Sequence, residues 1–240
     1  MIAKDAVPLS DVAKKLGRTV GRLTFTTPSH VYNPLAYAWT AHRQYLEKAG
    51  DAKGRVLLLG MNPGPWGMAQ TGVPFGEIHM ARDWLGIAAP LRGPLPQTHP
   101  RYPIVGFDCT RSEGSGKRFW GWAQQRFGTP EAFFAQLMVW NYCPLLFIAD
   151  GRNLVPGKLH ADELAPLLKA CDAALARLLD VLQPRAVVGI GRWAQERAQN
   201  ACGERIPVGY LLHPSPANPA ASKHWDQTAD AALAPWLESA

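Results

Sequence analysis

Four stretches of the chain are apolar enough to form buried strands, and longer amphipathic stretches separate them. The strand candidates are residues 56–59, 137–141, 186–191 and 206–212. Short apolar runs bounded by glycine or polar residues are typical of parallel strands that are buried on both faces. The pattern therefore predicts a parallel sheet.

Helices are expected between these strands. The clearest spans residues 161–182, where leucines recur at helical spacing until Pro184 ends the pattern. Segments 86–106 and 150–157 are rich in turn residues and predict loops. Strands that alternate with helices predict an α/β fold, namely a three-layer α/β/α sandwich with a mainly parallel, four-stranded central sheet. The other expected helices are 9–16, 35–48, 115–127, 192–201 and 225–237, with a helical turn at 81–85.

Length and composition favour one folded unit. The chain has 240 residues, of which 47% are hydrophobic, so it can bury a sizeable core. We expect a single domain over residues 1–240, with residues 1–30 as an N-terminal extension packed on it, and a monomer. The net charge of +6 favours a polyanionic partner, although only weakly.

The cysteines argue against a metal centre. Cys109, Cys143, Cys171 and Cys202 are about thirty residues apart and form no CxxC pair. Free thiols in a reducing intracellular compartment are the simplest interpretation, and we expect no metal and no other cofactor. The N-terminus has no apolar signal core and no run is long enough for a membrane span, so no membrane association is expected.

The loop after the first strand is unusually stiff. Residues 60–76 contain five glycines and three prolines. Glycine lets the backbone approach a ligand closely, while proline fixes the path of the chain. A pocket at the carboxyl end of a strand is where open α/β sheets bind ligands. The alternative is a tight connection without a ligand.

Three of the predicted strands are followed by a polar residue suited to a small ligand. Asn62 lies just beyond the first strand, Asn141 is the last residue of the second, and His213 follows the fourth. If these strands are neighbours, the three side chains reach one edge of the sheet. Each residue also has a structural alternative, because an amide or imidazole often satisfies the backbone at a strand end.

Five motifs resemble the single-strand-selective monofunctional uracil-DNA glycosylase family. They are GMNPGPWGMAQTGVPFGE, WNYCPLLF, GRNL, VVGIGR and LLHPSPANP, and the similarity runs from about Tyr32 to Trp225. The resemblance implies the uracil-DNA glycosylase fold and hydrolysis of the N-glycosidic bond of uracil in DNA. A base must leave the duplex to be attacked, which requires a closely fitting pocket.

The resemblance implies a role for each strand-end residue. Phe75 would stack under the flipped base, although a core role is the alternative. Asn141 would donate to O4 and accept from N3–H of uracil, provided that its amide is held in place. Asn62 would orient a water, and a donor at His213 would stabilise the departing base at O2. We therefore expect Asn62 and His213 to be catalytic.

Met61 and Gly64 complete the expected substrate site. Gly64 would leave space beside C5 of the base, so 5-hydroxymethyluracil should be accepted as well as uracil. Thymine would be rejected by a water held by the Met61–Gly64 backbone. No lysine lies in either motif core, which fits a monofunctional hydrolase.

The expected DNA contacts lie in three segments. The family pattern has an arginine where this chain has Ala217, so we expect weaker filling of the vacated duplex and a stronger preference for single strands. DNA is the expected partner in single- and double-stranded form, in the nucleoid of a bacterium or the nucleus of a eukaryote. The contact residues are Pro63, Arg152, Asn153, Lys158, Ser215, Pro216, Ala217, Asn218 and Lys223.

Two other functions remain open at this point. A phosphate- or nucleotide-binding enzyme could use residues 60–67, but the loop has neither GK[ST] nor GxGxxG. A non-catalytic binder of single-stranded nucleic acid would fit the charge and the aromatic content. It would not require Asn62 and His213 at converging strand ends.

Overall fold

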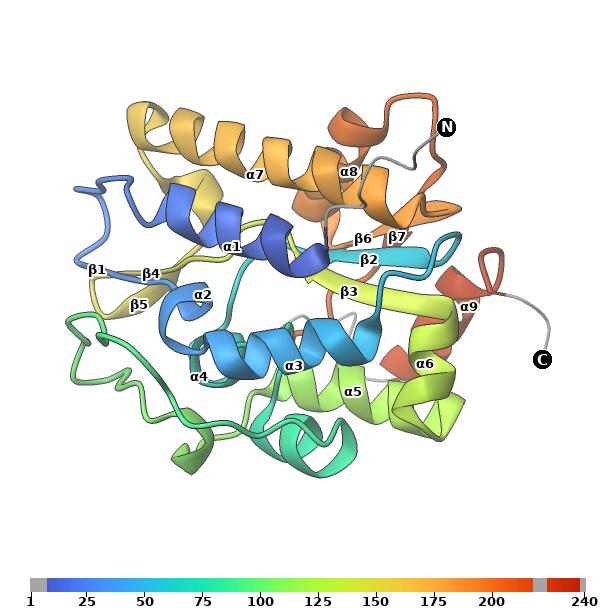
Figure 1. Cartoon of the computed structure of the whole chain (residues 1–240), viewed down its shortest axis with the longest axis horizontal. Helices are drawn as coiled ribbons and strands as arrows, with labels where there is room; N and C mark the ends of the chain where they lie inside the picture. The colour runs from blue at the N-terminus through green and yellow to red at the C-terminus, as the bar shows by residue number, and fades with distance from the viewer. Residues whose placement is uncertain (1–7, 218–223, 238–240) are drawn as a thin grey trace.

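A four-stranded parallel sheet lies at the centre of the computed structural model, which describes residues 8–217 and 224–237. The strand order is β3-β2-β6-β7. Helices α7 and α8 lie on one side of this sheet, and α3, α5 and α6 lie on the other (Figure 1). The predicted three-layer α/β/α sandwich is therefore confirmed. The strands are β2 (Val56–Gly60), β3 (Leu137–Asn141), β6 (Ala186–Ile190) and β7 (Val208–Leu211).

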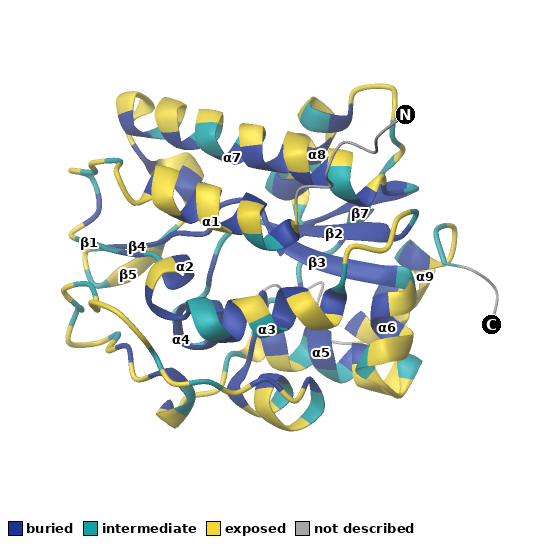
Figure 2. Cartoon of the chain, viewed as in Figure 1, coloured by how far each residue is buried: buried dark blue, intermediate teal, exposed yellow. Residues whose placement is uncertain are grey.

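Nine α-helices are assigned within the described residues. They are α1 (Leu9–Val20), α2 (Pro34–Tyr37), α3 (Trp39–Ala49), α4 (Met68–Thr71), α5 (Gly114–Phe127), α6 (Pro130–Gln136), α7 (Ala161–Leu182), α8 (Arg192–Cys202) and α9 (Trp225–Leu233). Three short helical turns are η1 (Met80–Trp84), η2 (Gly106–Asp108) and η3 (Pro156–Lys158). The helices on both faces explain why the sheet strands are apolar throughout: every residue of β2, β3 and β6 is buried (Figure 2).

A second, antiparallel sheet was missed by the sequence interpretation. It has the order β1-β4-β5, with β1 at His30–Tyr32, β4 at Leu146–Ala149 and β5 at Arg152–Leu154. Ala149 pairs with Arg152, so Asp150 and Gly151 form a two-residue hairpin turn, and both have positive φ (50° and 65°). Asp-Gly is a strong signal for this turn. The prediction of a loop over residues 150–157 was therefore wrong.

Several helix ends also differ from the predictions. The helix expected over residues 35–48 is divided into α2 and α3, because the backbone at Ala38 leaves the helical region. The first helix continues to Val20, and α9 ends at Leu233. Helix α1 packs against α7, and its buried residues Leu9, Val12 and Leu16 belong to the main core. No helix within the described ranges is long and apolar enough to cross a bilayer.

The topology places a crevice at the end of β2. The chain leaves β2 for β3 on one side and later returns to β6 on the other, so the connections diverge at β2. Ligands bind at such switch points, beyond the carboxyl ends of the strands. The residues that follow β2, β3 and β7 therefore share one edge of the sheet.

Candidate active site

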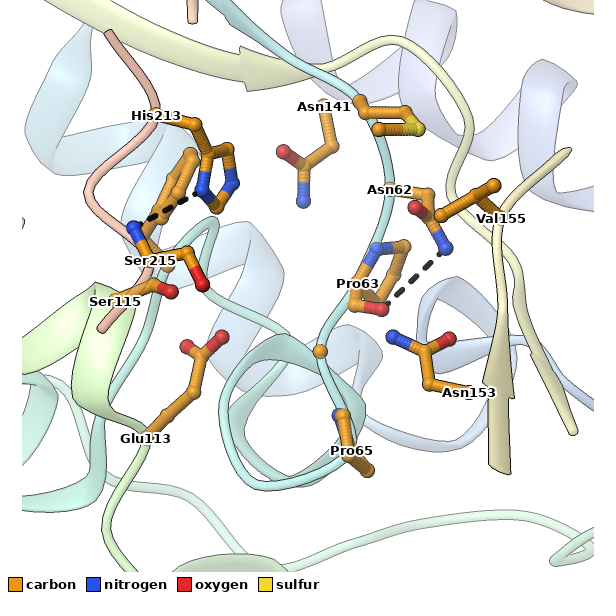
Figure 3. Close-up of a pocket in the computed structure, with 13 residues that line it drawn as sticks. Asn62, Pro63, Pro65, Glu113, Ser115, Asn141, Asn153, Val155, His213 and Ser215 are labelled. Atoms are coloured by element: carbon orange, nitrogen blue, oxygen red, sulfur yellow. Dashed lines mark hydrogen bonds between the residues drawn. The ribbon is translucent and has the colours of Figure 1, made fainter. Parts of the chain in front are cut away.

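A cavity of about 340 Å³ lies at this edge (Figure 3). Its volume is at the lower end of the range for small-molecule sites. The three strand-end residues predicted from the sequence, Asn62, Asn141 and His213, all line it, and so does Phe75. The other lining residues are Met61, Pro63, Gly64, Pro65, Glu113, Ser115, Asn153, Val155 and Ser215.

Asn141 presents an unused acceptor to the cavity. It ends β3 opposite Gly60 of β2 and is 6% exposed. Its Nδ2 donates to Sδ of Met68 at 3.2 Å, while its Oδ1 is buried without a hydrogen-bond partner. A thioether is a weak acceptor. The amide therefore keeps one N–H and its carbonyl oxygen available to a ligand that offers an acceptor next to a donor.

Gly60 makes this arrangement possible. A Cβ atom at this position would collide with Oδ1 of Asn141 and would lie 2.9 Å from the ring of Phe75. Both side chains therefore fill the space that a larger residue at the end of β2 would occupy. In the sequence, the glycine at position 60 is the feature that indicates such a close approach of other side chains to the backbone.

Asn62 is held by backbone carbonyl groups. Its Nδ2 lies 3.3 Å from the oxygen of Leu145 and 3.4 Å from that of Pro63. These contacts direct the NH₂ group to the protein and leave Oδ1 to accept a hydrogen bond. A neutral amide oxygen can orient a water, but it cannot take a full proton at neutral pH.

His213 is held as a neutral donor. The backbone N–H of Ser215 donates to its Nδ1 at 3.1 Å, so the proton of the neutral ring lies on Nε2, which faces the cavity (Figure 3). Burial lowers the pKa of His213 to about 4. Arg118 of α5 fixes the loop, because its Nη1 donates to the carbonyl oxygen of Pro214 at 3.0 Å.

Phe75 forms an aromatic wall of the cavity. It is 8% exposed, its ring stacks on Phe119 at 5.2 Å, and its centroid lies 5.8 Å from that of His213. Its φ of 53° is unusual for a bulky residue. Such strain is found where the surrounding structure fixes a side chain for a ligand.

Glu113 is a pocket residue that the sequence interpretation missed. It precedes α5, and its carboxyl group enters the cavity. Burial and, to a smaller extent, the negative charge of Glu77 raise its pKa to about 7, although the Gly116 amide opposes both effects. The sequence around position 113 has no motif or periodicity that indicates a side chain facing a ligand.

The predicted DNA contacts are distributed around the cavity. Asn153 and Ser215 line it, whereas Arg152 of β5 and Lys158 of η3 are exposed outside it. Ala217 is exposed, and its N–H donates to Oγ of Ser215. Pro216 packs against Gly114, where a Cβ would lie 2.5 Å from Cγ of the proline. Asn218 and Lys223 lie outside the described residues.

Within residues 8–217 and 224–237, no group of three or more histidine, cysteine, aspartate or glutamate residues could hold a metal ion. The four cysteines are buried and unpaired with one another.

Comparisons with known proteins agree with this geometry. The family model of the uracil DNA glycosylase superfamily matches residues 47–237. The chain is 51% identical over 203 residues to the bovine (Bos taurus) single-strand selective monofunctional uracil DNA glycosylase, covering 83% of this chain and 74% of that protein. It is 48% identical over 220 residues to the mouse (Mus musculus) protein of the same name, covering 90% and 78%.

A solved structure has the same fold. The crystal structure of wild-type Pedobacter heparinus SMUG2 superposes with a TM-score of 0.63 and covers 93% of this chain and 96% of its own. The sequence identity is 18%, so this likeness supports the fold alone.

Proposed function

Because this chain belongs to the single-strand selective monofunctional uracil-DNA glycosylase family of the uracil DNA glycosylase superfamily, we propose that it excises uracil from DNA and leaves an abasic site. It is a monofunctional DNA glycosylase, a hydrolase of N-glycosyl bonds that acts in base excision repair. One observation carries the proposal: two amides, one imidazole and one phenyl ring from distant segments surround a single cavity.

The cavity supports recognition of uracil by complementary polarity. The free carbonyl oxygen of Asn141 accepts from N3–H, and its remaining N–H donates to O4. Cytosine reverses both groups, which would leave two buried polar mismatches. Each mismatch costs about 1–3 kcal/mol. Phe75 supplies the face on which the extruded ring stacks.

Cleavage of the N-glycosidic bond is assigned to two neutral side chains, those of His213 and Asn62. The C1′–N1 bond breaks and its electron pair moves into the base, whose charge accumulates partly on O2. Nε2–H of His213 donates to O2, an interaction that strengthens as the charge develops. Oδ1 of Asn62 orients a water that attacks C1′, and the water loses its proton to solvent after the sugar has become cationic. Among the residues that the structure describes, no lysine lines the cavity, in agreement with hydrolysis without an amine nucleophile.

DNA would lie across the cavity mouth. We place Pro63 and the 215–217 loop at the extruded nucleotide, and the exposed Arg152 and Lys158 near phosphates. Both single- and double-stranded DNA are substrates, with uracil and 5-hydroxymethyluracil as the excised bases. The enzyme acts where cellular DNA is held, in the nucleoid or the nucleus.

The test is excision from a labelled oligonucleotide that contains one uracil, in single- and double-stranded form, with EDTA and without nucleotide. Abasic sites are revealed by alkaline cleavage. We expect product from the wild-type protein and a loss of about 10²–10³ in single-turnover rate for Asn62→Ala, with DNA binding retained. Asn200→Ala is the matched control, because Asn200 is exposed near the end of α8. Binding without excision by the wild-type protein would refute the proposal and favour a non-catalytic binder.

A further inference from the structure

Glu113 is an ionisable residue of the pocket to which the proposed chemistry assigns no task. It directly precedes α5, and its side chain makes no capping hydrogen bond to that helix. Its carboxyl group enters the cavity instead (Figure 3). Oε2 is buried without a hydrogen-bond partner. A buried polar group left open at a pocket is a candidate to bind the ligand.

The carboxyl group occupies the space beside two glycines. A Cβ atom on Gly64 would collide with Oε1 of Glu113, and one on Gly67 would collide with Oε2. The space beside Gly64, expected from the sequence to be open, is therefore filled by this carboxyl group. Glycine at both positions permits Glu113 to reach the cavity.

The expected orientation of the base brings C5 to this wall. In a pyrimidine ring, C5 lies directly across from C2, so a base whose O2 faces His213 points C5 away from that residue. Pro63 and Pro65 lie across the cavity from His213 (Figure 3). Gly64, the residue between these prolines, has no side chain, and the carboxyl group of Glu113 occupies the space where its Cβ would lie.

We propose that Glu113 determines which substituent is accepted at C5 of the extruded pyrimidine. Its carboxyl group exchanges a hydrogen bond with the hydroxyl of a 5-hydroxymethyl group, whereas the 5-methyl group of thymine covers the carboxyl group and leaves it unpaired. The inference rests on the proposed excision of uracil and names the residue that sets its substrate range.

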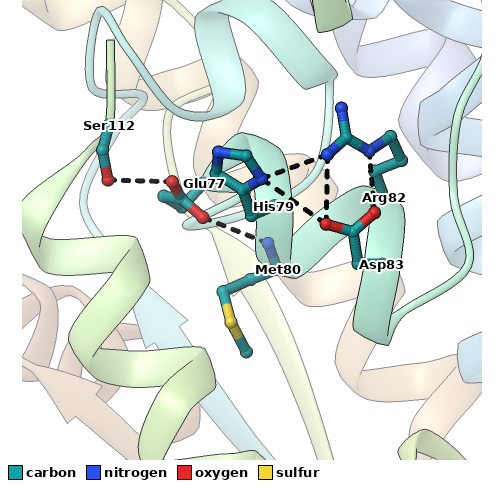
Figure 4. A network of polar contacts seen from close by, with 6 residues as sticks. All are labelled: Glu77, His79, Met80, Arg82, Asp83 and Ser112. Atoms are coloured by element: carbon teal, nitrogen blue, oxygen red, sulfur yellow. Dashed lines mark hydrogen bonds and ion pairs between the residues drawn. The ribbon is translucent and has the colours of Figure 1, made fainter. Parts of the chain in front are cut away.

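The surroundings of Glu113 suit this role. Glu77 lies nearby and is fixed by Oγ of Ser112 at 2.8 Å and by the N–H of Met80 at 3.1 Å (Figure 4). Burial and this neighbouring charge hold the pKa of Glu113 at about 7. The carboxyl group is thus protonated in part of the molecules at neutral pH, and a hydroxyl can donate to one form and accept from the other. In the described part of the chain, His213 is the other titratable group that lines the cavity.

The test compares an apolar and a polar replacement of similar length. Single-turnover rates are measured for Glu113→Met and Glu113→Gln on oligonucleotides that carry uracil, 5-hydroxymethyluracil or thymine at one position. Because one hydrogen bond is at stake, Glu113→Met should lower the 5-hydroxymethyluracil-to-uracil rate ratio about 3–10-fold and raise the thymine-to-uracil ratio about threefold or more. Glu113→Gln keeps a donor and an acceptor, so it should retain the first ratio within about twofold.

The two ratios separate recognition from general damage to the site. A merely structural role would lower all three rates together and would not move the ratios in opposite directions. The control is Glu131→Gln, because Glu131 is exposed at the start of α6. If Glu113→Met does not fold, Glu113→Ala makes the same comparison with a shorter apolar side chain.

Unchanged ratios in the apolar variant would overturn the inference while uracil excision by the wild-type protein stands. Failure of the wild-type protein itself to excise uracil would refute the proposed function, and the inference with it. The two failures are distinguishable because the first is seen in the rate ratios of the Glu113→Met variant and the second in the wild-type protein.

Discussion

The charge state of His213 has a measurable consequence for the pH dependence of excision. A histidine in water has a pKa of about 6.5, whereas burial lowers that of His213 to about 4. Protonation would also place a hydrogen on Nδ1, directly against the N–H that Ser215 donates to it. The imidazolium form therefore cannot keep the position of the neutral ring.

The size of the effect follows from the pKa. At pH 5.5, a group with a pKa of about 4 is about 3% charged, whereas an unshifted histidine would be about 90% charged. We therefore expect the single-turnover rate on single-stranded uracil DNA to be level between pH 7 and pH 5.5 and to fall only as the pH approaches 4. Removing the donor in His213→Leu should cost about 10²–10³ in rate.

The assay needs two controls. Glu113→Gln removes the other titratable group of the cavity, whose pKa is about 7, so that a change near neutral pH can be assigned. Circular dichroism checks folding, because a histidine with a lowered pKa stabilises the fold above pH 6.5 and loses that contribution as the pH falls toward 4. His42, buried and with a pKa of about 4, adds to the same loss.

A tenfold change in rate that titrates near pH 6.5 in Glu113→Gln would refute this reasoning. The NMR signal of the His213 ring gives an independent measure. It should remain in its neutral position at pH 5.5.

Two further substitutions test how the site is supported. Gly60→Ala should reduce the free energy of unfolding by about 1–3 kcal/mol and lower the excision rate, because the added Cβ would collide with Asn141 and press on Phe75. Urea unfolding measures this change. The control is Gly121→Ala in α5, where there is open space for the Cβ and the free energy of unfolding should rise by about 0.5–1 kcal/mol. Arg118→Ala removes the hydrogen bond to Pro214 and should lower the single-turnover rate about 3–10-fold with little change in DNA affinity; an equal loss of affinity and no loss of rate would show that Arg118 binds DNA and does not position His213.

The sequence predicted those parts of the fold whose signals are local and repeated. The helix over residues 161–182 and the strand over residues 137–141 have the predicted bounds, because each shows an unbroken apolar pattern. The antiparallel sheet was missed because its strands have only three or four residues. The Asp150–Gly151 turn did carry a signal, but it was interpreted as part of a loop.

In the site, too, some residues could be predicted from the sequence and others could not. Asn62, Asn141 and His213 were predictable because strand ends of a parallel sheet converge, and that topology was predictable as well. Glu113 was not, because its position depends on how α5 packs against the loops that contain Gly64 and Gly67. No periodicity in the sequence encodes that contact.

The polar groups of the cavity suggest how substrate range and catalysis can be separated. Asn62 and Asn141 carry no charge, and His213 is neutral above about pH 4. Within residues 8–217 and 224–237, no lysine or arginine lines the cavity. The negative charge on a departing base must therefore be stabilised by oriented dipoles near O2, where His213 lies. As inferred above, Glu113 lies beside C5, on the side of the ring away from O2, where it does not take part in the hydrogen bond between His213 and O2. A change at position 113 can thus alter which bases are accepted with a smaller effect on bond cleavage than a change at position 213.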